Sequence, residues 1–440
     1  MNFYTKTFLA NIFTVIFAFI SVVTHANAAN RHPAFDHKIP HDISHMDPEM
    51  TGQEYEGLLN TYSKKSSHTL HLNRIHSRDA LDEIMTVGKR NLDLLGIVNQ
   101  QKPENQKLEL WTPENTMAYP IEAPSISNRT LIRDRYDEVV RNLPQGLKDI
   151  LIGGGELKLP STISDDIYLE HARKLDRAYQ SASRWLLQEP YLFSYEMRAK
   201  DDVRGFYHLS RDKDLNQKFE KYESLDEETK RLIKTSLIQM CRNNGVQLSN
   251  CKRRIDNAIL EKSLTRLYDG YKNKSQALWD SFFKLGAKRR DVDWNSNSPL
   301  VATMPFQNPE SPVVKQWLID NVEDEWKWAG WQLKLNFTNS SWGTAHIVFV
   351  PGATPNVNGL AGNKITMDAN RPIDHYSTRW TIRHEFGHVL GYPDCYIEFY
   401  DSEEQVMVNY QLDITDLMCS RRGKLKQIHF DEFKRNYFKN

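Results

Sequence analysis

Residues 384–394 read HEFGHVLGYPD and constrain this chain more than any other stretch. Residues four apart lie on one face of a helix, so His384 and His388 can offer two imidazole nitrogens to one metal ion. Zinc prefers that type of ligand. We expect Gly391 to end the helix, because glycine enters the left-handed conformation without steric cost. The chain can then turn back and bring Asp394 to the metal as a third ligand.

The residue types in this stretch also indicate a chemistry. Three protein ligands leave one zinc position for water, which is the arrangement of a catalytic site. Glu385 follows the first ligand and is the residue expected to handle protons. The same helix has a face for the core, with apolar residues at helical spacing: Ile382, Phe386, Val389 and Leu390. The sequence therefore predicts one catalytic Zn2+ beside a buried helix.

The pattern H-E-x-x-H-x-x-G-x-x-D resembles that of the metzincin clan of zinc endopeptidases, and its aspartate is similar to that of the snapalysin-type secreted bacterial peptidases. Metzincins also carry a methionine turn under the metal, and residues 416–420 (DLMCS) fit it with Met418 as the turn methionine. Most members have histidine as the third ligand, so Asp394 departs from the commonest pattern. The resemblance covers about the last third of the chain. It implies a zinc metalloendopeptidase that hydrolyses bonds in protein or peptide substrates.

From about residue 295 the pattern predicts mixed α and β structure. The expected elements are strands at Leu300–Phe306, Leu333–Phe337, His346–Val350 and Lys364–Ala369, helices at 312–330 and Phe430–Phe438, and a loop at 396–413. This order matches the metzincin N-terminal subdomain. In that family the strand before the active helix forms the upper cleft edge and pairs with substrate, here through Ile365, Thr366, Met367 and Asp368. An ordinary sheet edge is the alternative.

Residues 1–28 look like a secretory signal peptide. Lys6 supplies a positive charge, residues 8–23 are apolar, and Ala26-Asn27-Ala28 is an A-x-A cleavage site. We expect cleavage after Ala28 and a secreted or periplasmic protein without a membrane span. A membrane anchor is the alternative, although the apolar run is short and interrupted by polar residues.

The four cysteines fit an oxidising compartment. Cys241 and Cys251 are ten residues apart, on either side of a turn-like Asn-Asn-Gly. Cys395 follows Asp394 directly, and Cys419 follows Met418. A Cys395–Cys419 disulfide therefore ties the third-ligand loop to the methionine turn, and leaves Cys241 to pair with Cys251. Four cysteines permit three pairings, so this choice is a hypothesis.

The expected fold class is α+β. Residues 29–72 are expected to form an irregular arm, 73–293 a mostly helical region, and 294–440 a metzincin-like zinc metallopeptidase domain. Helix starts are expected at Thr130, Ser164 and Ser224. The helical region is either a propeptide, with Lys288-Arg289-Arg290 as a processing site, or a permanent accessory domain. The sequence does not choose between these.

The charge balance of the chain bears on which binding partners can be expected. The 57 basic and 57 acidic side chains balance, which gives no support for a nucleic-acid or anionic-membrane partner. The oligomeric state is not indicated.

Several alternatives to this interpretation stay open. A different third ligand is possible in principle, as in other zincin groups: Glu398, Glu403 or Glu404. In some metzincins a tyrosine assists the transition state, and nothing selects among the nearby ones: Tyr392, Tyr396, Tyr400 and Tyr410. From another class, the protein is a non-catalytic, zinc-stabilised binding or adhesion module whose helical region is the working part. Hydrolysis of a non-peptide cell-wall bond is also open.

Overall fold

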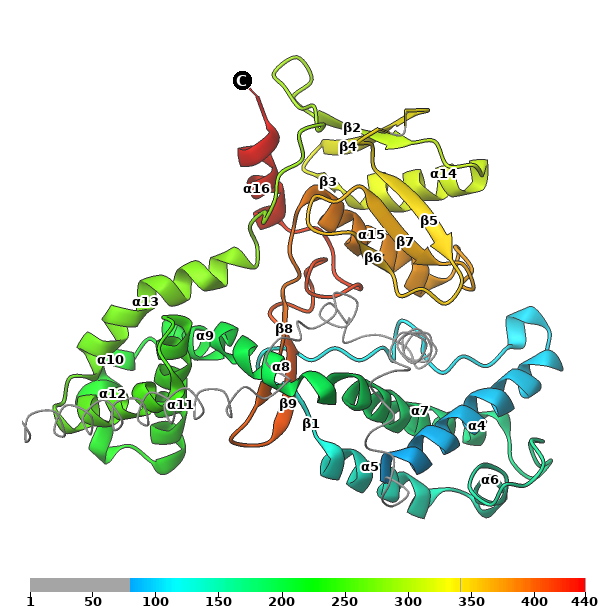
Figure 1. The fold of residues 1–440 in the computed structure, drawn as a ribbon, viewed down its shortest axis with the longest axis horizontal. Helices are drawn as coiled ribbons and strands as arrows, with labels where there is room; N and C mark the ends of the chain where they lie inside the picture. Colours follow the sequence, from blue (N-terminus) through cyan, green and yellow to red (C-terminus); the bar gives the residue numbers. More distant parts are fainter. Residues whose placement is uncertain (1–79, 341, 440) are drawn as a thin grey trace, which may run out of the picture.

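The computed structural model describes residues 80–340 and 342–439 (Figure 1). The expected signal peptide at 1–28 and the irregular arm at 29–72 lie outside the described residues. Helices make up most of the regular structure and the strands form small sheets, which is compatible with the predicted α+β class. Within the described ranges, no helix has both the length and the apolar character needed to cross a membrane.

The first part of the described chain is helical, as predicted. Its α-helices are α4 Ala80–Gln100, α5 Arg129–Asn142, α6 Gln145–Leu151, α7 Asp165–Gln188, α8 Leu192–Arg198, α9 Arg204–Arg211, α10 Leu215–Glu220, α11 Glu227–Asn243, α12 Leu248–Leu260 and α13 Leu264–Ser281. Short 3-10 turns are η3 Glu104–Gln106, η4 Glu189–Tyr191, η5 Ala199–Asp201 and η6 Tyr222–Ser224. The strand β1, Ser125–Ser127, was not expected in this region.

The helix starts are set by side chains that accept a hydrogen bond from the first turn. Ser164 does so for α7, as predicted, accepting from the backbone N–H of Ile167. The other two predicted starts were wrong. Asn128 caps α5, and Asp226 caps α11. Asparagine and aspartate are good N-caps, and each lies two residues from the serine or threonine that was expected.

The helices form two groups, each with its own core. Helices α4 to α7 pack around one cluster of buried apolar side chains, and α9 to α13 pack around another (Figure 1). The predicted Cys241–Cys251 disulfide is present and joins α11 to α12, with a Cα–Cα distance of 5.7 Å.

The second part of the chain contains the strands and the predicted active helix. Its elements are β2 Val301–Gln307, α14 Pro312–Leu318, the π-helical segment η7 Ile319–Glu323, β3 Lys327–Trp328, β4 Trp331–Thr338, β5 His346–Val350, β6 Asn356–Val357, β7 Lys364–Asp368, α15 Tyr376–Leu390, β8 Tyr396–Asp401, β9 Val406–Gln411 and α16 Gln427–Tyr437.

Two element predictions in this part were wrong. The helix expected to reach Gly330 ends as η7, and β3 and β4 follow as a hairpin that turns at Gly330, whose φ is 86°. The loop expected at 396–413 is instead the hairpin of β8 and β9. Both hairpins are stabilised by pairing between strands, which apolar periodicity along one segment does not reveal.

The sheet next to the active helix contains β5, β7 and β6, in that order. Strand β7 pairs in parallel with β5 and antiparallel with β6. A bridge between Phe306 and Ala345 joins β2 to the start of β5, so the sheet of β2, β4 and β3 continues beside it. The expectation that β7 is the edge strand is wrong for Ile365 and Thr366, because Val357 and Asn356 of β6 pair with them. The edge is β6.

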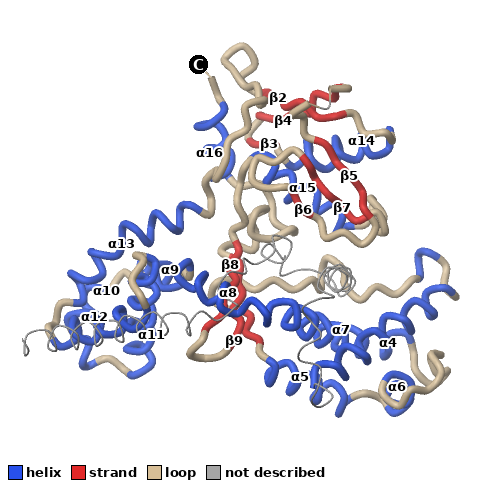
Figure 2. The backbone as a smooth tube through the Cα atoms, in the orientation of Figure 1, coloured by secondary structure: helices blue, strands red, loops and turns tan. Residues whose placement is uncertain are grey.

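The third sheet connects the two parts of the chain. Strand β1 pairs with β9 (Figure 1), and β9 pairs with β8 (Figure 2). Met407 of β9 lies in the core of α4 to α7. Tyr410 of β9 donates a hydrogen bond to Asp202, 2.7 Å away, in the helical part. The helical region and the C-terminal region therefore share buried contacts across the expected boundary at residue 293.

Candidate metal centre

Helix α15 presents the predicted motif. It begins after His375, whose ring accepts a hydrogen bond from the backbone N–H of Ser377, and it ends at Gly391, whose φ is 101°. A Cβ at Gly391 would lie 2.0 Å from the carbonyl oxygen of Ala287, so glycine is required there for space as well as conformation. The predicted core face is fully buried: Ile382, Phe386, Val389 and Leu390.

The three predicted ligands come together. The Nε2 atoms of His384 and His388 lie 3.1 Å and 3.2 Å from the same carboxylate oxygen of Asp394. One atom from each side chain lies within 4.8 Å of the others. The side chain of Asp394 is 10% exposed, so the group is reached from a cavity rather than from open surface.

Hydrogen bonds to the backbone fix both imidazoles. Nδ1 of His384 lies 2.8 Å from the carbonyl oxygen of Leu417, and Nδ1 of His388 lies 2.8 Å from that of Tyr392. A carbonyl oxygen only accepts, so each Nδ1 carries the proton and each Nε2 presents a lone pair. Two lone pairs then face a carboxylate oxygen, an arrangement that requires a positive charge between them. Two nitrogens and one carboxylate oxygen fit Zn2+.

The electrostatics of His388 agree with this requirement. Burial lowers the pKa of its imidazole, but the facing carboxylate of Asp394 more than offsets this, and the pKa is raised overall. The position therefore favours a positive charge, either a proton or a cation.

Met418 lies directly under the helix, as expected of a methionine turn. It is fully buried, and a Cβ placed on Gly387 would lie 2.2 Å from its sulfur. Gly387 stands between the two histidines in the motif, so the methionine packs against the helix at the level of the ligands. The backbone N–H of Cys395 donates to the carbonyl oxygen of Met418 at 3.0 Å.

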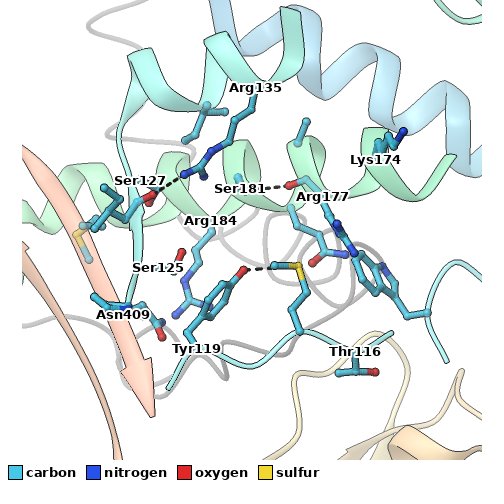
Figure 3. Close-up of a pocket in the computed structure, with 18 of the residues that line it drawn as sticks. Thr116, Tyr119, Ser125, Ser127, Arg135, Lys174, Arg177, Ser181, Arg184 and Asn409 are labelled. Atoms are coloured by element: carbon cyan, nitrogen blue, oxygen red, sulfur yellow. Dashed lines mark hydrogen bonds between the residues drawn. The ribbon is translucent and has the colours of Figure 1, made fainter. Parts of the chain in front are cut away.

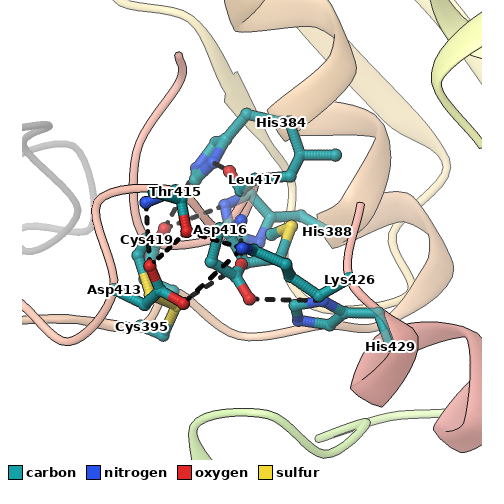
Figure 4. Close-up of a disulfide and its surroundings, with 12 residues drawn as sticks. His384, His388, Cys395, Asp413, Thr415, Asp416, Leu417, Cys419, Lys426 and His429 are labelled. Atoms are coloured by element: carbon teal, nitrogen blue, oxygen red, sulfur yellow. Dashed lines mark hydrogen bonds and ion pairs between the residues drawn. A yellow bond between two sulfur atoms is a disulfide. The ribbon is translucent and has the colours of Figure 1, made fainter. Parts of the chain in front are cut away.

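The predicted Cys395–Cys419 disulfide is present, with a Cα–Cα distance of 4.3 Å (Figure 4). Cys395 directly follows Asp394, and Cys419 directly follows Met418. The bond therefore connects the loop of the third ligand to the methionine turn, in addition to the backbone hydrogen bond between them.

A buried acid and a buried histidine support the turn from below. Asp416 accepts a hydrogen bond from the backbone N–H of Met418 at 2.8 Å, and burial raises the pKa of Asp416 to about 7. Nδ1 of His429 lies 3.4 Å from the second carboxylate oxygen, and burial lowers the pKa of His429 to about 4 (Figure 4). Both groups are neutral at slightly acidic pH, which suits an interior position.

The metal-ligand group opens into a cavity of about 580 Å³. Glu385 lines this cavity beside the ligands. One side is formed by Asn356 and Val357 of the edge strand β6. Further lining residues come from the helical part of the chain, from α8, η5 and the end of α13: Arg198, Asp201, Leu278, Ser281 and Phe282. Sequence reasoning missed β6 and these helical residues, because no local sequence pattern predicts that they lie near residues 384–394.

The alternative third ligands are not grouped with the two histidines. Glu398 forms a buried ion pair with Arg184. Glu403 and Glu404 lie exposed in the turn between β8 and β9, and Glu403 pairs with Lys252. The structure brings Asp394, and none of these, to the two histidines.

The four tyrosines near the motif differ in whether they line the metal cavity. Tyr396 lines the cavity, and the other three do not. Tyr392 is buried and donates to the carbonyl oxygen of His429, while Tyr410 donates to Asp202. Tyr396 is therefore the tyrosine placed to contact a ligand.

The middle residue of the suggested processing site is buried in the folded chain, whereas Lys288 and Arg290 are exposed. The side chain of Arg289 is 3% exposed and is paired with Asp291. Its guanidinium also donates to the carbonyl oxygens of Ala361 and Gly362. A protease that recognises Lys288-Arg289-Arg290 needs this side chain in solution.

Fold and site thus define a mixed helix-and-sheet protein with a buried two-histidine, one-aspartate centre. Comparisons of the chain with family models, with curated proteins and with solved structures found no match. The relationship to the metzincin clan stays a prediction from the motif.

Proposed function

We propose that this protein is a secreted zinc-dependent endopeptidase in which His384, His388 and Asp394 hold the ion. The observation that carries the proposal is the convergence of two Nε2 lone pairs and one carboxylate oxygen beside Glu385 in one cavity. When bound there, zinc supplies a Lewis acid and lowers the pKa of its water toward neutrality. The motif resemblance and the position of Met418 support the same proposal.

Glu385 is the general base in this proposal. It follows His384 on α15, lines the cavity and is only 8% exposed. Its carboxylate accepts a proton from the attacking water and passes that proton to the amine nitrogen as the peptide C–N bond breaks. Tyr396 lines the same cavity and its phenol can donate a hydrogen bond to the oxygen of the scissile carbonyl.

The substrate chain is held by β6 in this proposal. In the described residues β6 pairs only with β7, so its other edge has backbone groups that can bind an extended peptide. Asn356 and Val357 line the cavity. They replace Ile365, Thr366, Met367 and Asp368 as the proposed substrate-binding strand.

The helical region is a permanent part of the enzyme in this proposal. Its residues line the metal cavity, β1 pairs with β9, and Met407 is buried among α4 to α7. Removal of residues 73–293 would expose these surfaces. The non-catalytic binding module is less well supported, because a structural zinc site has four protein ligands and the group found among the described residues has three.

Zinc content and proteolysis of an unfolded protein test the proposal. We expect one zinc per chain in the parent and in Glu385→Ala, with cleavage lowered about 100-fold or more in the variant. Asp394→Ala should lose zinc, and Glu403→Ala, an exposed control, should keep it. A well-folded parent that binds no zinc would exclude the proposed centre.

A further inference from the structure

The structure contains a second cavity, of about 620 Å³ (Figure 3). It is bounded by α5 and α7, by strands β1 and β9, and by the first turns of α15. Aromatic side chains contribute to its wall: Trp111, Tyr119, Tyr376 and Trp380.

The two cavities adjoin. Glu398 and Arg421 line both of them. Helix α15 also runs from one to the other, with Trp380 in the second cavity and Thr381 in the metal cavity. The two cavities therefore share part of one wall, and α15 lies along both of them.

The length of α15 gives the distance involved. Tyr376, which lines the second cavity, and Glu385 are nine residues apart on the helix. A rise of about 1.5 Å per residue makes this roughly 13 Å. An extended peptide covers that distance with about four residues.

The second cavity has a basic lining although the whole chain has no net charge. Two of its lining residues are acidic, Glu138 and Glu398, and five are basic: Arg135, Lys174, Arg177, Arg184 and Arg421. Glu398 is neutralised by its ion pair with Arg184. Lys174 is also paired, with Glu170, so five basic residues face three acidic ones at this cavity and a smaller surplus of positive charge remains.

A buried polar atom in the wall also lacks a partner. Asn409 of β9 is 7% exposed and donates its amide to Glu398, but its Oδ1 has no hydrogen bond to any described residue. It lines the cavity beside Arg184, which donates to the same Glu398 oxygen (Figure 3). An unpaired buried acceptor costs free energy unless a bound group supplies a donor, and a peptide N–H is such a donor.

We infer that the second cavity is a subsite for an acidic segment of the peptide substrate, with an aspartate or glutamate held about four residues from the scissile bond. This inference rests on the proposed peptidase function. Arg135 and Arg177 provide planar guanidinium groups that match a carboxylate, and the aromatic wall covers the apolar part of the peptide.

Binding of labelled octapeptides to the full mature chain tests the cavity directly. We expect octaglutamate to bind about tenfold more tightly than octaglutamine. The double variant Arg135→Gln/Arg177→Gln should remove this preference. Arg254→Gln/Arg266→Gln, which removes the same charge from exposed positions of α12 and α13, should keep it. Equal binding of both peptides by the parent, or an equal loss in the control variant, would overturn the inference.

Mapping of cleavage sites in an unfolded protein by mass spectrometry separates this inference from the proposed function. The parent should prefer sites with an acidic residue about four positions away, and Arg135→Gln/Arg177→Gln should lose that preference. Cleavage without any acidic preference overturns the subsite and supports the peptidase. Octaglutamate binding without cleavage supports the acidic site and overturns the peptidase.

Discussion

Removal of the Cys395–Cys419 disulfide should lower zinc affinity, whereas removal of the other disulfide should cost a similar free energy of unfolding and leave zinc affinity unchanged. The bond connects the loop of Asp394 to the turn of Met418, and both cysteines are buried. The double variant Cys395→Ala/Cys419→Ala removes this connection. Cys241→Ala/Cys251→Ala is the matched control, since its disulfide is also buried and joins two helices away from the metal.

The chain-entropy relation gives the expected cost in stability. A sequence separation of 24 residues corresponds to about 3.4 kcal/mol, and a separation of 10 residues to about 2.7 kcal/mol. The two variants should therefore differ by less than about 1 kcal/mol in the free energy of unfolding. Urea unfolding monitored by circular dichroism measures both values.

Zinc affinity should separate the two variants. Loss of a group that orients a ligand typically lowers metal affinity by about 10–100-fold. We expect that loss for Cys395→Ala/Cys419→Ala and no change for the control, measured by competition with a chelator. Equal zinc affinities in the two variants would refute the argument that this disulfide positions Asp394.

Three further predictions concern the interior. Gly387→Ala places a methyl group against the methionine sulfur and should cost about 1–3 kcal/mol in thermal unfolding, with a loss of zinc. Arg184→Ala leaves the buried carboxylate of Glu398 without its cation and should cost about 3–5 kcal/mol in urea unfolding. Burial raises the pKa of Asp416 to about 7, so the folded chain keeps a proton that an unfolded aspartate loses near pH 4, and stability falls as the pH rises through 7. The asparagine of Asp416→Asn stays neutral at every pH. The free energy of unfolding of this variant minus that of the parent should therefore fall by roughly 2–3 kcal/mol from pH 8 to pH 5 in thermal unfolding.

Each of these has a matched control. Gly96→Ala in α4 meets nothing within 4 Å and should raise stability slightly, so a similar loss there would argue against the methionine contact. Arg184→Ala/Glu398→Gln should recover much of the loss from Arg184→Ala, and no recovery would mean that the uncompensated charge is not the cause. A pH-independent effect of Asp416→Asn would show that its carboxyl titrates normally.

Much of the candidate metal centre could be predicted from the spacing of residues along the sequence. His384 and His388 share a helix face because they are four residues apart, and Gly391 ends that helix because only glycine fits its conformation and its space. Cys395 and Cys419 were paired from their positions beside Asp394 and Met418, and the structure contains that bond.

The positions that sequence reasoning misjudged depend on distant partners. The segment 396–413 has no apolar period because the hairpin of β8 and β9 is buried on both faces, by its own core and by the helical part. The prediction that Ile365 lies at the sheet edge was wrong, because the two-residue strand β6 pairs with β7 on that side. A strand that short has no signal of its own.

The sequence by itself predicted the candidate ligands, the proposed base and the disulfide pairs, because these follow from helix periodicity and from neighbours along the chain. Only the tertiary structure decided what surrounds them. It grouped Asp394 with the two histidines, paired Glu398 with Arg184, and brought the helical part of the chain to the wall of the cavity beside the candidate ligands. Such contacts join residues far apart in sequence through burial and strand pairing, and one sequence carries no local record of them.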